Sequence, residues 1–76
     1  MQIAELKQEC AFIDFGNACD SQGRYEEALE AYDRALGIVP DDADVLFDKG
    51  ETLVKVGRAD EAAGYFARAM ALYVGA

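Results

Sequence analysis

Histidine and tryptophan are absent from this sequence of 76 residues, and proline, serine and threonine occur once each. Without histidine there is no imidazole base and no histidine ligand for a metal. Ser21 and Thr52 lie in no nucleophile motif, and no Cys-x-x-Cys pair or phosphate-binding glycine loop is present. An enzyme that uses carboxylates alone would need a closed pocket with a carboxyl pair of raised pKa. We therefore expect a protein that is not an enzyme and has no cofactor or metal.

Basic residues are scarce, since seven lysines and arginines stand against 15 acidic residues and give a net charge of −8. An acidic surface repels nucleic acid and anionic membranes, so we expect neither as a partner. The alternative is that the charge only keeps the protein soluble. Long apolar runs are also missing, so no membrane-spanning segment is expected. The first residues lack the basic region and apolar run of a signal peptide.

The two cysteines are predicted to be unpaired. Cys10 and Cys19 fall on one predicted helix, where their nine-residue separation places them about 13 Å apart. No disulfide spans that distance. Reduced thiols indicate a reducing compartment, and we therefore expect a cytoplasmic location.

A period of 34 residues organises the chain. Gly16 recurs as Gly50, and the turn Gly23-Arg24 recurs as Gly57-Arg58. The same offset relates Asp14, Glu27, Ala28, Arg34 and Ala35 to Asp48, Glu61, Ala62, Arg68 and Ala69. A fixed period of this length is typical of helical repeat arrays. A chain of this length forms at most one domain, and its core is small.

Apolar spacing and stop signals predict four helices and no strands. Gly23 and Gly57 end the first and third helices, and Pro40 ends the second. Asp41, Asp42 and Asp44 open the third helix, where carboxylates cap free N–H groups. A calcium loop would require a glycine where Phe47 stands, so capping is the preferred interpretation. The expected helices span residues 2–21, 25–38, 43–56 and 59–73.

Small residues recur in mid-helix and indicate close packing. Gly16 and Gly50 are unfavourable in a helix unless a partner backbone must come close. Ala28 and Ala62 lie at matching depth on the second helix of each pair. Gly64 is a weaker signal for the approach of another helix. Each pair of helices is thus predicted to nest in antiparallel fashion.

The 34-residue helix–turn–helix with these landmarks resembles the tetratricopeptide repeat. The resemblance implies an all-α fold in which antiparallel pairs stack as a short right-handed α-solenoid. It divides the chain into an N-terminal helical extension (1–8), repeat 1 (9–42) and repeat 2 (43–76). The residues that carry it in repeat 1 are Phe12, Gly16, Cys19, Ala28, Tyr32, Ala35 and Pro40. Those in repeat 2 are Leu46, Gly50, Leu53, Ala62, Phe66 and Ala69.

Two positions depart from the family pattern. Lys49 replaces the apolar residue that Phe15 supplies in repeat 1, so its ammonium must turn outward or meet a carboxylate. Val74 replaces the terminal proline, so the last helix is free to continue to the chain end. No polar capping helix follows repeat 2.

The resemblance implies a protein–protein interaction module that binds a peptide or partner protein on the concave face formed by the first helix of each pair. Basic residues that would hold an acidic C-terminus in chaperone-binding members are missing at Ile13 and Asp48. We therefore expect a ligand with apolar and basic side chains, or else a plain solvated face. The family's contact positions fall on Cys10, Ile13, Asp14, Asn17, Asp20 and Ser21 and on Asp44, Phe47, Asp48, Glu51, Val54 and Lys55.

The alternative function is that of a self-assembling scaffold, because two repeats fall below the usual minimum of three. Two apolar patches lack a partner within the predicted chain and mark interaction surfaces. A symmetric homodimer would cover both. One patch consists of Ile3, Leu6, Cys10 and Ile13, and the other of Tyr65, Met70 and Tyr73.

Overall fold

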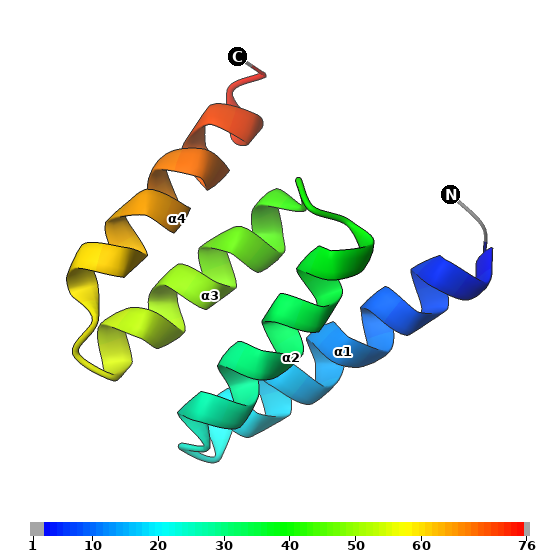
Figure 1. Cartoon of the computed structure of the whole chain (residues 1–76), viewed down its shortest axis with the longest axis horizontal. Helices are drawn as coiled ribbons and strands as arrows, with labels where there is room; N and C mark the ends of the chain where they lie inside the picture. The colour runs from blue at the N-terminus through cyan, green and yellow to red at the C-terminus, as the bar shows by residue number, and fades with distance from the viewer. Residues whose placement is uncertain (1–2, 76) are drawn as a thin grey trace.

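The computed structural model describes residues 3–75, and within that range the chain is helical and contains no strand. The helices are α1 (Ile3–Ser21), α2 (Tyr25–Ile38), α3 (Ala43–Lys55) and α4 (Ala59–Tyr73). Consecutive helices pack together, so that the pair α1–α2 is followed by the pair α3–α4 in one stack (Figure 1). This confirms the predicted all-α fold of antiparallel pairs stacked as a short solenoid. Residue 2, also expected in the first helix, lies outside the described residues.

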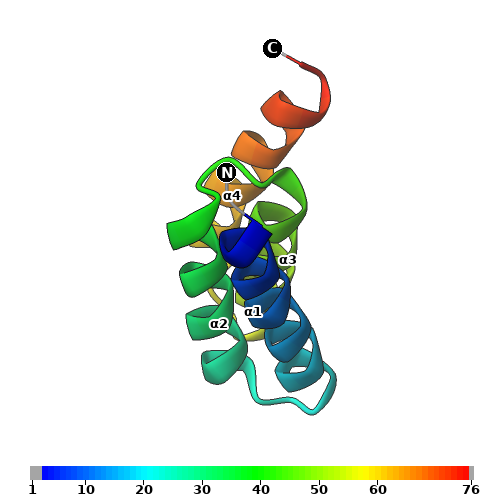
Figure 2. The same ribbon diagram turned by 90° about the vertical axis from the view of Figure 1, so that its right-hand side faces the viewer.

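The turns within each pair end their helices as the glycines predicted. Gly23 and Gly57 adopt left-handed φ values of 76° and 81°. The next amide, of Arg24 or Arg58, donates to the carbonyl of Cys19 or Leu53 at 2.8 Å, which satisfies a carbonyl at the helix end. Both turns lie at one end of the molecule, and the 39–42 connection lies at the other (Figure 2).

The start of α3 and the end of α4 test two further predictions. The Asp42 carboxylate accepts from the amides of Asp44 and Val45 at 3.1 and 3.3 Å, which confirms helix capping. α4 ends at Tyr73, which confirms the predicted range of 59–73, and it does not continue to the chain end although the family's proline is missing. Gly75 takes a left-handed φ of 69°, which is incompatible with a continuing helix.

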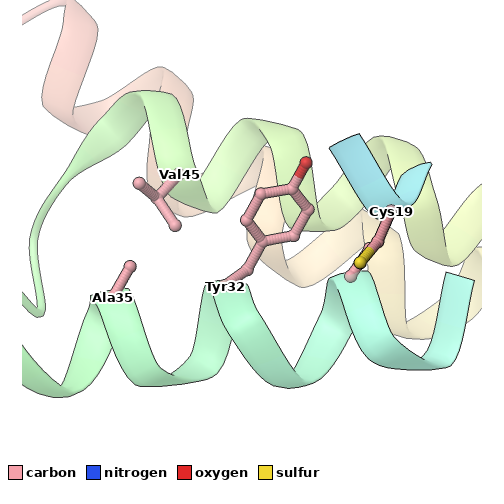
Figure 3. Packing of buried hydrophobic residues seen from close by; sticks show 5 residues of the cluster. Cys19, Tyr32, Ala35 and Val45 are labelled. Carbon is pink, nitrogen blue, oxygen red and sulfur yellow. The ribbon is translucent and has the colours of Figure 1, made fainter. Parts of the chain in front are cut away.

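The core consists of two buried clusters. The first joins both repeats through Cys19, Ala28, Tyr32, Ala35 and Val45, with Tyr32 between the helices (Figure 3). The second contains Leu29, Leu53 and Ala62, against which Tyr65 and Phe66 pack.

The mid-helix glycines make room for aromatic rings. A Cβ added to Gly16 would lie 2.6 Å from Cε1 of Tyr32, and one added to Gly50 would lie 2.7 Å from Cε1 of Phe66. A neighbour does come close at both glycines, but the prediction of a partner backbone there is wrong, because the nearest atoms belong to an aromatic ring. Around Gly64 an added Cβ would meet nothing within 4 Å, so no helix of this chain approaches there.

Candidate functional site

The surface shared by α1 and α3 carries the residues that the sequence assigned to ligand binding. We call it the α1–α3 face. Every one of these side chains is exposed or half-buried, so the fold leaves all of them accessible. The face consists of Cys10, Ile13, Asp14, Asn17, Asp20, Ser21, Asp44, Phe47, Asp48, Glu51, Val54 and Lys55.

Asp20 ties the two helices of this face together. Its carboxylate accepts from the Thr52 hydroxyl and from the Lys55 ammonium, each at 2.6 Å. Partial burial works to raise the pKa of Asp20, but these two hydrogen bonds hold it below its ordinary value. The one base of the face is thereby already paired with an acid.

Thr52, the residue that donates to Asp20, was not predicted as part of this site. Its side chain is fully buried. A signal was present, since Thr52 stands 34 residues after Ala18 and so places a polar side chain at a position that is apolar in repeat 1. A buried hydroxyl requires a partner, and Asp20 supplies it.

Asn17 is fixed from the core side. Its amide oxygen accepts from the hydroxyl of buried Tyr32 at 2.7 Å. Burial, followed by the negative charges of Asp48 and Asp20, raises the pKa of Tyr32, so the phenol keeps the proton that it donates. The NH₂ group of Asn17 is then the part of the side chain that can donate to a ligand carbonyl.

Asp48 is the most perturbed acid of the α1–α3 face. Burial raises its pKa to about 6, and the neighbouring charges of Glu51, Asp44 and Asp20 act in the same direction. The carboxylate is thus crowded by like charge at neutral pH. A cation placed against it would relieve that repulsion and favour the ionised form.

The apolar part of the face is formed chiefly by Phe47 and Val54, which are 39% and 49% exposed. The Phe47 ring packs against Phe66 with centroids 5.2 Å apart and planes inclined by 54°. Ile13, predicted to join them, is half-buried because it packs on the first core cluster. Its contribution to an exposed floor is therefore smaller than predicted.

Some residues of the predicted self-association patches have partners within the chain, contrary to what the sequence predicted. Tyr65 packs on the second core cluster, and its hydroxyl lies 2.8 Å from the Lys49 ammonium. Ile13 is half-buried as described. Tyr73 donates its hydroxyl to Asp44, although its ring remains exposed. The other members remain exposed, namely Ile3, Leu6, Cys10 and Met70.

Lys49, which departs from the repeat pattern, meets a carboxylate, which is one of the two outcomes that the sequence predicted. Its side chain is only 12% exposed, and its ammonium forms an ion pair with Asp33 of α2. It also lies over the Tyr65 ring, 4.4 Å from the centroid. Burial works against the charge of Lys49, but Asp33 and Tyr65 raise its pKa above the ordinary value. This pair spans the contact between the two repeats.

Two further observations concern residues 3–75 as a whole. None of the described helices combines the length and apolarity needed to cross a membrane. In the same range, histidine, cysteine, aspartate and glutamate form no group with the arrangement of a metal site.

Stacked helix pairs with an accessible face on the first helix of each pair define a helical-repeat module for protein–protein interaction. A family model described as TPR repeat matches residues 16–57, and the chain belongs to the tetratricopeptide repeat family. Repeats of this family bind proteins and are not catalytic modules.

The chain is also similar to protein arginine N-methyltransferase 9. It is 42% identical to the human protein over 53 residues, or 70% of this chain. It is 43% identical to the mouse protein over 49 residues, or 64% of this chain. In both cases the matched segment spans only 6% of the relative's length.

Proposed function

We propose that the α1–α3 face binds an extended segment of a partner protein that carries both apolar and basic side chains. The observation that supports this proposal is that exposed Phe47 and Val54 are surrounded by carboxylates. The one lysine of the face, Lys55, is already paired with Asp20. The binding residues are those predicted, Ile13, Asp14, Asn17, Asp20, Asp44, Phe47, Asp48, Glu51, Val54 and Lys55.

Apolar contact supplies most of the affinity in this proposal. Phe47 and Val54 expose surface that a ligand can remove from water, at about 25 cal/mol per Å². Each exposed charge pair contributes less than about 1 kcal/mol. The carboxylates therefore steer association and reject acidic segments more than they hold the complex together.

Asp48 is the preferred contact for the basic side chain. Its raised pKa reflects burial and crowding that a guanidinium or ammonium group would offset. The matched relatives are named as arginine methyltransferases, which makes arginine the first candidate for this side chain. Arginine also presents a planar fork that suits a carboxylate, whereas lysine acts as a point charge.

The test uses short peptides that hold apolar residues constant and vary the charged residue among arginine, lysine and glutamate. Binding to the whole chain is measured by calorimetry, with circular dichroism to verify folding. Phe47→Ala and Val54→Ala are expected to weaken binding more than Asp48→Asn does. Val54→Ala is the matched variant because the Phe47 ring also packs against Phe66, which packs on the second core cluster. Preference for the glutamate peptide, or the reverse ranking of variants, would contradict the proposal.

We propose self-association as the second candidate function, for which the exposed apolar residues Ile3, Leu6 and Met70 are the supporting observation. Static light scattering over a concentration series measures it. A fully folded chain that remains monomeric at high micromolar concentration would contradict it.

The organisation and location of the chain complete the proposal. We take residues 1–8 as a helical extension, 9–42 as repeat 1 and 43–76 as repeat 2. Cys10 and Cys19 are both free thiols, which supports a cytoplasmic location. Within the chain itself we propose no catalytic site, since the carboxyl with the most strongly raised pKa among the described residues, that of Glu9, is buried and closed to a substrate.

A further inference from the structure

The contact between the two repeats shows what each side of a repeat junction presents. Four polar contacts cross it. Lys49 forms an ion pair with Asp33, and Arg58 lies 3.9 Å from Glu26. The other two are the hydrogen bonds that Thr52 and Lys55 donate to Asp20.

Each residue on the repeat 2 side of this junction has an equivalent in repeat 1, 34 positions earlier in the sequence, and these equivalents lie on the outer surface of repeat 1. Subtracting 34 from each residue number takes Lys49 to Phe15 and Thr52 to Ala18. The same step takes Lys55 to Ser21 and Arg58 to Arg24. All four of the resulting side chains are exposed, and we call them the head face: Phe15, Ala18, Ser21 and Arg24.

The period also transfers the repeat 1 side of the junction onto repeat 2. Adding 34 takes Asp33 to Ala67, Asp20 to Val54 and Glu26 to Asp60. These side chains are likewise exposed, and we call them the tail face: Val54, Asp60 and Ala67. α1 and α4 lie at the two ends of the stack (Figure 1), so the head face, mostly on α1, and the tail face, mostly on α4, lie toward its opposite ends.

The head and tail faces match each other in charge at every transferred contact. Where the internal junction pairs lysine with aspartate, the outer faces offer Phe15 and Ala67, both apolar. Where Asp20 accepts from threonine and lysine, the outer faces offer Val54 against Ala18 and Ser21. Wherever one outer face lacks a charge that the internal junction has, the opposing position on the other outer face lacks its charge as well.

The one ionic contact that the outer faces keep has opposite charges. The internal pair Arg58–Glu26 becomes Arg24 on the head face and Asp60 on the tail face. Arg24 is held by Glu27 at 2.8 Å, just as Arg58 is held by Glu61. Since Arg58 reaches Glu26 while bound to Glu61, Arg24 can reach a second carboxylate in the same way.

We propose that copies of this chain associate head to tail, with the tail face of one copy packing on the head face of the next as α2 packs on α3. This inference rests on the proposed self-association and specifies its geometry. The occupant is a second copy because the two faces complement each other pair by pair. Phe15, which is 51% exposed, would become buried against Ala67.

The geometry differs from the symmetric dimer that the sequence predicted. A head-to-tail contact uses two different faces, so each copy retains one free face and the assembly grows open-ended. The charge of −8 on each copy opposes growth over long distances. Added salt screens that repulsion, so association should strengthen from low to moderate ionic strength.

The decisive variants recreate the internal ion pair at the outer junction. Phe15→Lys places an ammonium against Ala67, and Ala67→Asp places a carboxylate against Phe15. Each single variant buries a charge without a partner, so self-association should weaken by at least about tenfold. The double variant Phe15→Lys/Ala67→Asp, or an equimolar mixture of the two single variants, should restore association because the new lysine and aspartate meet. Sedimentation velocity over a concentration series measures all four samples, with circular dichroism to verify folding.

The matched control is Leu72→Lys, which adds the same charge to an exposed apolar residue of α4 outside both faces. It should leave association unchanged. If the chain associates and only Leu72→Lys disrupts it, or if the single variants have no effect, the head-to-tail geometry is wrong while self-association stands. If the parent chain stays monomeric at high micromolar concentration, both are wrong and the two faces belong to other repeats or partners.

Discussion

Glu9 offers the most direct test of the energetics of this fold. Its side chain is only 6% exposed, and its Oε2 atom has no hydrogen-bond partner within the described residues. Burial raises its pKa from 4.5 to about 7, and Asp42 adds to the rise through a hydrogen bond and its negative charge. Asp42 is also the cap of α3, so ionised Glu9 crowds a carboxylate that the fold requires.

The sign of the pH dependence follows from this rise in pKa. Between about pH 4.5 and pH 7 the folded chain holds a proton on Glu9 that the unfolded chain has released. The free energy of unfolding therefore falls as the pH rises through this window. A rise from 4.5 to about 7 corresponds to at most about 3 kcal/mol of stability, present in acid and lost above neutrality.

Glu9→Gln removes the charge while it keeps the shape and a donor for Asp42. We expect this variant to be more stable than the parent by about 1–3 kcal/mol near pH 8 and nearly equal to it near pH 5, where Glu9 is mostly protonated. Urea unfolding followed by circular dichroism at both pH values measures the difference.

The matched control is Glu5→Gln, which removes the same charge from an exposed position of the same helix. It should change stability by less than about 0.5 kcal/mol at both pH values. If Glu9→Gln gave the same difference at both pH values, or destabilised the chain near pH 8, the assignment of a buried acidic proton to Glu9 would be refuted.

Three further predictions concern packing and charge. Gly50→Ala should destabilise the chain by about 1–3 kcal/mol in urea unfolding, because its Cβ would collide with the Phe66 ring. Gly64→Ala should instead stabilise the chain by up to about 1 kcal/mol, and equal effects of the two variants would contradict this account. Asp33→Ala should cost about 1 kcal/mol or more by leaving Lys49 unpaired, and adding Lys49→Met should recover most of that cost in a double-mutant cycle. Affinity for an arginine-bearing peptide should rise as the pH increases through about 6 and Asp48 ionises, and Asp48→Asn should flatten that calorimetric profile.

The sequence predicted the helices well because their ends depend on local chemistry. Gly23 and Gly57 form left-handed turns, and Asp42 caps α3 through its own side chain. Such signals lie within a few residues of the structure that they specify. The end of α4 has the same local origin, because Gly75 takes a left-handed φ and terminates that helix in the absence of the family's proline.

The candidate site was less predictable because its partners come from different repeats. The family positions identified which side chains are accessible, but not that Asp20 binds Thr52 and Lys55 across 32 and 35 residues. Tyr65 was assigned to an exposed face because its partner Lys49 lies on another helix. Helical periodicity indicates which residues share a face of one helix, and it does not identify what a neighbouring helix places against that face.

Comparison of the two repeats separates positions that maintain the fold from positions that choose a neighbour. Gly16 and Gly50 are identical because each must admit a ring from its own pair of helices, and any side chain would collide with it. Lys49 and Phe15 occupy equivalent positions, but among the described helices only Lys49 faces a helix that precedes its own pair. For Lys49 that helix is α2 with Asp33, and a charge is matched by a charge. In the proposed head-to-tail contact the exposed phenylalanine at the equivalent position would meet Ala67 of another copy, so that an apolar side chain is matched by an apolar one.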